Sequence, residues 1–257
     1  MDGPNVNLKL IKDLETYLKS VHDEGDRRFV FMGSCGLHVV NNAFKTGFGD
    51  KNSGWYVISY LRAVYNLFKD NPSRRGDLIK YSGSSHLPLK FCSVRWLNNG
   101  SVAIRGKELL PGLAKFKTGI ESDSKHGGIT SFSYGVVKDA LKDTLLPCKL
   151  AFFTQIAGEI EPFLTEFQSN APMAPFLYTE LKSLLTSLFD MIVKKDILDK
   201  ETCIWKIDLK ESKNLIFSKN FKFAPSVKTE LRKVTLTDKQ MLCFKDDCIK
   251  IVKAMCV

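Results

Sequence analysis

A cysteine and a histidine stand three residues apart near the start of the chain, at Cys35 and His38. A pair with this spacing could supply half of a zinc site. No second pair repeats it, since His86 and Cys92, for example, are six residues apart. A nucleophilic role would need an electropositive pocket and an orienting third group, and the sequence indicates neither. The residue types alone therefore favour a structural histidine at the start of a helix, packed under a sheet.

The charge of the chain points to polyanionic partners. It carries 38 Lys and Arg against 28 Asp and Glu, a formal net charge of +10 at pH 7. Such an excess favours DNA, RNA or an anionic membrane surface. Most basic residues are scattered lysines, and only Arg74-Arg75 and Lys194-Lys195 come close to patches. On charge alone, a solvated lysine-rich surface is the favoured interpretation.

Cysteine usage and hydropathy indicate the compartment. The seven cysteines are an odd number and mostly far apart, and no charged-plus-apolar leader is recognisable. We therefore expect reduced thiols in an intracellular compartment. No apolar run approaches the ~20 residues that a membrane-spanning helix needs, so we expect no membrane partner.

The first ~50 residues are expected to be an α/β segment. A turn-type sequence at 2–5 precedes apolar residues at helical spacing over 8–18, which predicts an amphipathic helix. The apolar run 29–32, the glycine-containing turn 33–36 and the helical spacing over 37–44 predict a buried strand, a sharp turn and a helix.

The remainder is expected to be mostly helical. A stripe from Trp55 to Phe68 predicts one helix, ended by Asn71-Pro72, and a capping box at 237–240 opens the last. Glycine, serine, proline and basic residues predict loops over 73–90 and 117–133, and residues 199–233 are expected to be irregular. Further helical stretches, with breaks or kinks at Gly100, Pro111, Pro147 and Pro162, are expected at 94–116, 136–168 and 176–198.

Three short motifs follow one another along the chain: Asp2-Gly3-Pro4-Asn5-Val6-Asn7, Cys35-Gly36-Leu37-His38 and Arg95-Trp96. In this order they resemble motifs of the hAT family of DNA transposases and their domesticated relatives. The first is similar to the segment around the second catalytic aspartate of that family's RNase H-like core. The second resembles its C-x-x-H motif at a strand-to-helix junction, and the third its R-W motif in a helical insertion domain.

The resemblance implies an ancestral catalytic site. RNase H-like nucleotidyl transfer uses two Mg²⁺ ions held by three carboxylates from separate elements. Asp2 matches the second acid, whereas the first would precede Met1 and the final glutamate would follow Val257. We therefore expect Asp2 to be an inherited Mg²⁺-ligand position without activity, and Mg²⁺ to bind only where the full set is present. The alternative is an acid in a frayed terminus.

The resemblance also implies three nucleic-acid-binding residues. His38 would approach the DNA backbone at the cleavage point by donating to a phosphate. Trp96 would stack on a base turned out of the duplex, and Arg95 would contact phosphate. Alternatively, Trp96 anchors the insertion helices while Arg95 is solvated, and both interpretations of this pair can hold together.

These expectations combine into a mainly α protein with a small α/β part. Residues 1–50 would be a partial RNase H-like segment, and residues 51–257 a helical insertion domain with flexible loops near 71–90 and 117–133. The expected function is DNA or other nucleic-acid binding, or protein interaction including self-association, without independent catalysis. The resemblance implies the nucleus, and the cytoplasm is the alternative. Two alternative functions stay open: part of a longer, active Mg²⁺-dependent transposase, and a purely helical interaction module.

Overall fold

The computed structural model describes residues 5–21, 36–92, 99–123, 128–168 and 173–257. Within these ranges the chain is almost entirely helical, and the only strand-type pairing is an isolated antiparallel bridge between Val193 and Leu215. The mainly α class is therefore confirmed. The strand predicted at 29–32 lies outside the described residues.

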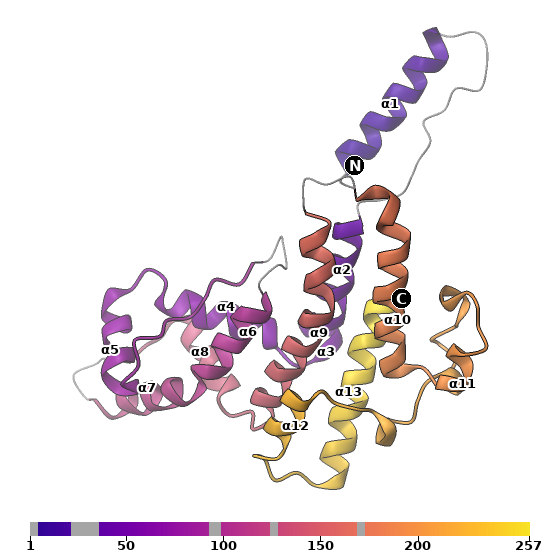
Figure 1. Cartoon of the computed structure of the whole chain (residues 1–257). Coiled ribbons are helices and arrows are strands. Elements are labelled where there is room, and N and C mark those ends of the chain that lie inside the picture. Colours follow the sequence, from indigo (N-terminus) through magenta and orange to yellow (C-terminus); the bar gives the residue numbers. More distant parts are fainter. Residues whose placement is uncertain (1–4, 22–35, 93–98, 124–127, 169–172) are drawn as a thin grey trace.

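Four long helices form a bundle in which α9 and α13 run opposite to α2 and α10 (Figure 1). Their bounds are Gly36–Phe48 (α2), Leu146–Glu166 (α9), Leu177–Ile192 (α10) and Asp238–Cys256 (α13). Aromatic rings fill the space between α2 and α9, with the centroid of Phe153 lying 4.8 Å from that of Phe48. At Gly47, an added Cβ would lie 2.4 Å from the Met255 side chain, so α2 and α13 approach this closely only because that residue is glycine.

A second group of helices lies beside the bundle, on the left in Figure 1, and is joined to it by packing of α6 on α9. It consists of Val57–Phe68 (α4), Pro72–Ser82 (α5), Asn99–Glu108 (α6), Leu110–Ser122 (α7) and Phe132–Ala140 (α8). The buried Tyr60 hydroxyl donates a 2.9 Å hydrogen bond to the Gly106 carbonyl, which ties α4 to α6. Burial raises the pKa of this hydroxyl, so it remains a donor.

Trp55 connects the two groups. It follows the short helix α3 (Asp50–Ser53), and its indole stacks on Phe244 with ring centroids 5.3 Å apart. Its Nε1 donates to an Asp247 carboxylate oxygen at 3.3 Å, and the Phe152 ring packs edge-on at 5.7 Å. Trp55 is therefore a core residue, as the sequence predicted. Phe48 belongs to the same core, and the division at residue 50 stays a prediction.

The segment between α10 and α13 is largely irregular, as expected for 199–233. It contains the short elements Lys195–Leu198 (α11), Ile204–Lys206 (η2), Ser212–Asn214 (η3), Ser218–Asn220 (η4) and Pro225–Leu231 (α12). Two backbone hydrogen bonds flank the isolated bridge, from Lys194 N to Asn214 O at 3.0 Å and from Ile216 N to Ile192 O at 2.9 Å. These bonds close residues 194–214 into a loop against the end of α10.

The prediction of a loop over 73–90 was wrong for its first half, which forms α5. Asn71 caps this helix by accepting from the Arg74 backbone N–H at 3.0 Å, and Pro72 lies in its first turn. Leu78 is its only buried residue, so α5 carries too weak an apolar stripe for periodicity to reveal it. The predicted excursion over 117–133 was also too long, since α7 continues to Ser122 and α8 begins at Phe132.

The breaks predicted at prolines are confirmed where they begin helices. Pro111 and Pro147 lie in the first turns of α7 and α9, where a missing backbone N–H costs no helical hydrogen bond. Pro162 lies inside α9, which continues past it. The capping box is also present, because the Thr237 hydroxyl accepts from Gln240 N and the Gln240 side chain accepts from Thr237 N.

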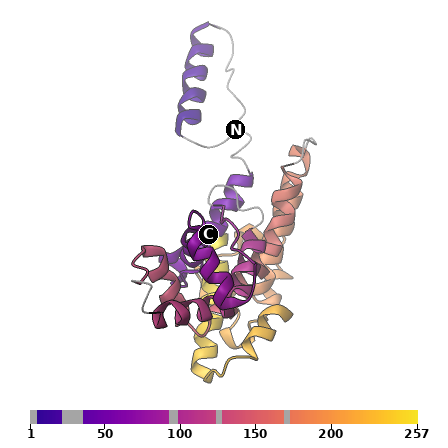
Figure 2. The ribbon, with the colours of Figure 1, turned by 90° about the vertical axis from the view of Figure 1, so that its left-hand side faces the viewer.

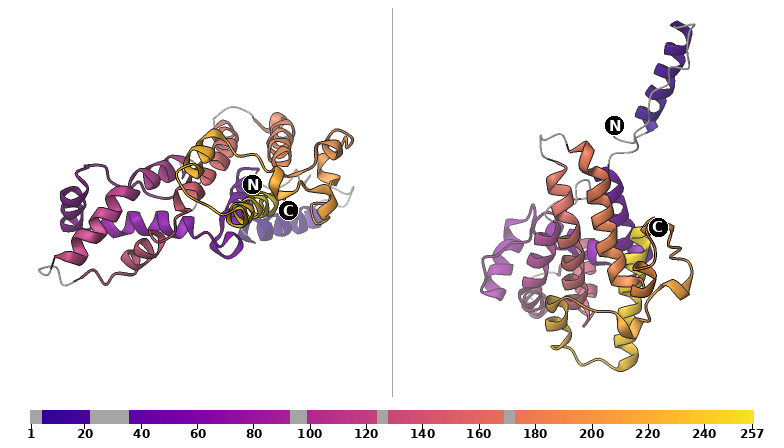
Figure 3. Two further views of the ribbon diagram at one scale, coloured as in Figure 1. Left: turned by 90° about the horizontal axis from the view of Figure 1, so that it is seen from below. Right: turned by 45° about the vertical axis from the view of Figure 1, so that its right-hand side comes forward.

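The predicted N-terminal helix is present as α1 (Asn5–Val21). A short 3-10 helix, η1 (Ala174–Phe176), directly precedes α10. Figure 2 and the right panel of Figure 3 show α1 standing away from the helical body. None of its described side chains belongs to the hydrophobic core. Among the described residues, its apolar face therefore packs on no part of the core.

Candidate nucleic-acid interface

Only one residue of the predicted site can be placed. His38 lies exposed in the first turns of α2, whereas Asp2, Cys35, Arg95 and Trp96 lie outside the described residues. Over the described ranges, no group of three or more His, Cys, Asp or Glu side chains could hold a metal ion. The described residues therefore do not form the carboxylate set that Mg²⁺ chemistry would need, and we derive no metal-dependent step.

The basic pair Arg74-Arg75 has a structural role. Arg75 Nε donates to the Phe68 carbonyl at 2.7 Å, and its Nη2 donates to the Lys69 carbonyl. Arg74 Nη1 donates to the Leu67 carbonyl at 3.3 Å. These carbonyls end α4 and have no partner within the helix, so the two guanidinium groups complete its C-terminus. A phosphate would have to compete with these bonds.

The other basic pair, Lys194-Lys195, begins a lysine-rich stretch, residues 194–222, which we name the lysine–aromatic segment. It contains eight lysines against five acidic residues. Three of the acids are engaged locally: Glu211 pairs with Lys213 at 2.7 Å, Asp208 accepts from the Lys210 backbone N–H at 2.8 Å, and Glu201 accepts from the Cys203 backbone N–H at 3.2 Å. Six lysines are exposed and make no ion pair with described residues: Lys195, Lys200, Lys206, Lys210, Lys219 and Lys222.

Phe217 is the centre of this segment. Its side chain is 65% exposed, and the Nζ atoms of Lys194 and Lys219 lie 5.6 and 5.8 Å from its ring centroid. The Lys194 side chain is held in place, because its Nζ donates to the Lys213 carbonyl at 2.6 Å; at Lys219 the backbone is held, because its carbonyl accepts from Lys245 Nζ of α13 at 2.9 Å. The result is an exposed aromatic ring with two ammonium groups within 6 Å of its centroid.

Trp205 is a second exposed aromatic of the segment. Its side chain is 51% exposed, while its neighbours Ile204 and Ile207 are buried and anchor η2 to the body. Tyr178 of α10 packs edge-on against the indole, with centroids 5.9 Å apart. Our sequence reasoning missed both aromatics. The available signal was their position beside lysines, in Trp205-Lys206 and in the Phe217 to Lys219 stretch.

These groups can stack on bases and contact phosphates. An exposed ring offers a face to a base of any kind, and nearby ammonium groups attract the flanking phosphates. The segment has no arrangement that suits acid–base or nucleophilic catalysis. Elsewhere, burial raises the pKa of the Cys148 and Cys256 thiols to about 11 and about 12, so neither is an activated nucleophile.

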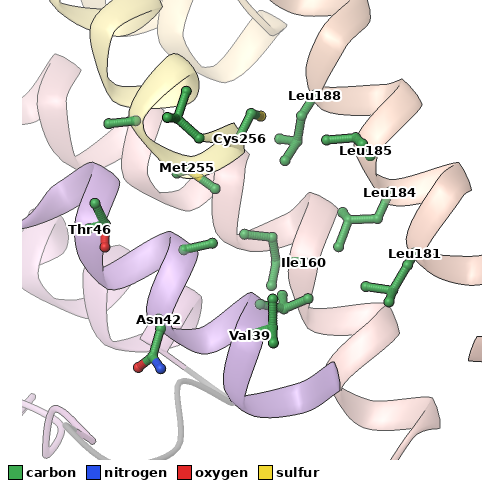
Figure 4. Close-up of a pocket in the computed structure, with 14 residues that line it drawn as sticks. Val39, Asn42, Thr46, Ile160, Leu181, Leu184, Leu185, Leu188, Met255 and Cys256 are labelled. Carbon is green, nitrogen blue, oxygen red and sulfur yellow. The ribbon is translucent and has the colours of Figure 1, made fainter. Parts of the chain in front are cut away.

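A separate surface is an apolar groove of about 510 Å³ between α2 and α10 (Figure 4). Leu181 and Leu184 of α10 face Val39 of α2 across it, and Ile160 of α9 lies between them. Leu185 lies nearer Cys256 of α13. None of the described residues that line it has a charged side chain. Its chemistry suits an apolar occupant, and its described lining offers no positive charge to a phosphate.

Comparison with protein-family models, with curated proteins and with solved structures found no match to this chain. In the part of the chain that the structure describes, no helix combines the length and apolar character needed to cross a membrane. Cys148, Cys203, Cys243, Cys248 and Cys256 are free thiols.

Proposed function

We propose that this chain binds single-stranded or unpaired nucleic acid through the lysine–aromatic segment, without catalysing a reaction on it. The observation that carries the proposal is the exposed Phe217 ring with the Lys194 and Lys219 ammonium groups within 6 Å of its centroid. Stacking of a base on an aromatic side chain contributes ~1–3 kcal/mol, and it tolerates any sequence because every base has a π-face.

Two further features support this ligand. The chain carries a net charge of +10, which favours a polyanionic ligand over a neutral or basic one. The resemblance to hAT transposases implies an ancestor that handled DNA with unpaired bases. The segment contains lysine and no arginine, so we expect affinity to depend on charge and stacking rather than on base identity.

The test is binding of the full chain to fluorescently labelled single-stranded DNA and duplex DNA, followed by anisotropy between ~50 and ~200 mM salt. We expect single strands to bind more tightly, affinity to fall steeply with salt, and Phe217→Ala to weaken binding. The matched control is Phe132→Ala, which removes a ring that is 87% exposed on α8 and should leave binding unchanged. A folded chain that binds at no salt concentration would exclude the proposal.

The same assay separates the residues that the resemblance implies. If the ancestral arrangement binds DNA, then His38→Ala and Trp96→Ala should weaken binding more than Phe217→Ala does. In the alternative of a longer Mg²⁺-dependent transposase, a labelled hairpin would be nicked in the presence of Mg²⁺ and Asp2→Ala would abolish nicking. Binding lost at Phe217 with no nicking supports our proposal.

A second candidate function, a helical protein-interaction module, is favoured by the apolar groove of Figure 4. The fitting partner would present an amphipathic helix with a leucine-rich face. Its binding would change little with salt, because a groove without charged lining residues releases no counterions. Salt dependence therefore distinguishes the two functions.

A further inference from the structure

We propose that α1 docks, as an amphipathic helix, in the apolar groove between α2 and α10 of its own chain. This inference is independent of nucleic-acid binding, because it rests on the groove and on α1 alone. It assigns a use to the two apolar surfaces that the described structure leaves uncovered.

The first step concerns α1 itself. Leu10, Leu14, Tyr17 and Val21 recur at steps of three and four, so they share one face of the helix, and all four are exposed. The opposite face carries polar residues, Thr16 among them. A 17-residue helix without tertiary contacts is marginal in water. A helix with such a face is stabilised chiefly by burying it.

The second step concerns the groove. Val39 is 51% exposed at one wall, and Leu181 and Leu184 are half-buried at the other. Figure 4 shows these side chains directed towards the space between α2 and α10, while Asn42 and Thr46 lie at its margin. Because the described lining of the groove contains no lysine, arginine or acidic residue, a row of leucine-like side chains complements it better than a charged ligand does.

The third step is connectivity. The chain enters α2 at Gly36, where an added Cβ would lie 2.7 Å from the Leu177 side chain, so the first turns of α2 and α10 meet at one end of the groove. Residues 22–35 join α1 to this point, and 14 residues can span up to ~45–50 Å. Since α1 is itself only about 25 Å long, the connection allows it to reach back along the groove.

The linker between α1 and α2 also favours α1 of the same chain over α1 of a second copy as the helix that fills the groove. Two segments joined by a short linker meet at an effective concentration in the millimolar range. A second copy of the chain supplies its α1 at the much lower bulk concentration. We therefore assign the groove to the chain's own α1 rather than to that of a neighbouring molecule.

The test is hydrogen exchange of the full chain, followed by mass spectrometry at two protein concentrations. We expect the amides of α1 to exchange at least ~10-fold more slowly than in a peptide of residues 5–21, independently of concentration. Leu184→Asp in the groove should return α1 to the peptide rate. Ser183→Asp, next to it on the exposed side of α10, should leave α1 protected. Unchanged exchange in α9 and α13 verifies that each variant is folded.

A second pair of variants probes the helix rather than the groove. Leu14→Asp should abolish protection of α1 and speed exchange in α10, whereas Thr16→Asp on the opposite face should do neither. Peptide-like exchange of α1 in the folded wild type would overturn the proposal, as would protection that survives Leu184→Asp. Protection that appears only at the higher concentration would reject docking within one chain and assign the groove to α1 of a second copy.

Discussion

The apolar groove and the lysine–aromatic segment adjoin each other at Leu185 of α10 and Cys256 of α13 and have opposite chemistry. Both contact α10 and the end of α13, yet the described residues that line the groove have no charged side chain, whereas the segment carries eight lysines in 29 residues, 194–222. Added salt screens exposed charges and leaves apolar burial intact or strengthened. One protein can therefore hold a salt-sensitive and a salt-insensitive interaction surface, and each should be removable without the other.

The largest effect is expected where the two regions share a core. Phe152 is fully buried in α9, and its ring contacts Trp55 and Phe221, 5.7 and 6.1 Å away between centroids. Phe152→Ala should lower the free energy of unfolding by ~3–5 kcal/mol, because it removes apolar contacts and leaves a cavity. Urea denaturation measures this loss. A variant with near wild-type stability would contradict a single core beneath both surfaces.

An intermediate effect is expected at an ion pair that belongs to neither region. Glu230 of α12 pairs with Lys107 of α6 at 2.9 Å and with Lys233 at 3.0 Å, and its side chain is 11% exposed. Glu230→Gln should lower the free energy of unfolding by ~1–3 kcal/mol while leaving nucleic-acid affinity unchanged. Thermal denaturation and anisotropy on the same sample test both statements. A loss of affinity in a stable variant would extend the interface to α12.

The same pair predicts a pH dependence. Burial acts to raise the pKa of the Glu230 carboxyl, but hydrogen bonds from Lys107 and Lys233 outweigh it and hold the pKa below the ordinary glutamate value. The unfolded chain therefore takes up this proton first as pH falls. The contribution of Glu230 to stability should be complete above the ordinary glutamate pKa and should disappear as pH drops through the lowered value. The stability difference between wild type and Glu230→Gln should shrink over that acidic interval; a constant difference would contradict it.

The next effect is expected at the exposed Phe217 ring of the lysine–aromatic segment. Phe217→Ala should weaken single-strand binding ~5- to 150-fold, equivalent to ~1–3 kcal/mol, without changing the melting temperature. Phe217→Trp retains a stacking face and should bind at least as tightly as wild type. Anisotropy titrations at fixed salt compare the three proteins. Equal loss in both variants would indicate a packing role for Phe217 rather than stacking.

The smallest effect concerns a single charge. Lys219→Gln should reduce the magnitude of the slope of log K against log salt by ~0.7, the value for one lost phosphate contact on a single strand. Lys115→Gln removes an exposed lysine from α7, in the group of helices beside the bundle, and should leave the slope unchanged. A slope that responds equally to both changes would mean that the whole surface, not the segment, attracts the nucleic acid.

The helices that bury a broad apolar stripe were predictable from sequence. Trp55 to Phe68 predicted α4, the capping box at Thr237 predicted the start of α13, and leucine spacing predicted α10. Helix α5 was missed because Asn71-Pro72 was interpreted only as the end of α4. Those residues also cap and open the next helix, and only local hydrogen bonding reveals this second role.

The candidate interface was less predictable because it depends on contacts between distant residues. Lys194 and Phe217 are brought together by the Val193–Leu215 bridge, and neither helical nor strand periodicity predicts such an isolated pairing. The motifs on which the transposase resemblance rests predict a different set of nucleic-acid-binding residues. Of these residues, only His38 is described, and it lies exposed on α2, on a different element from Phe217.

The most direct test of the account is hydrogen exchange of the full chain with and without saturating single-stranded DNA. We predict slower exchange in residues 194–222, with the groove side of α10 and all of α1 unchanged by the ligand. Slowed exchange around His38 and residues 93–98, with 194–222 unaffected, would contradict the assignment of the interface and favour the arrangement that the transposase motifs imply.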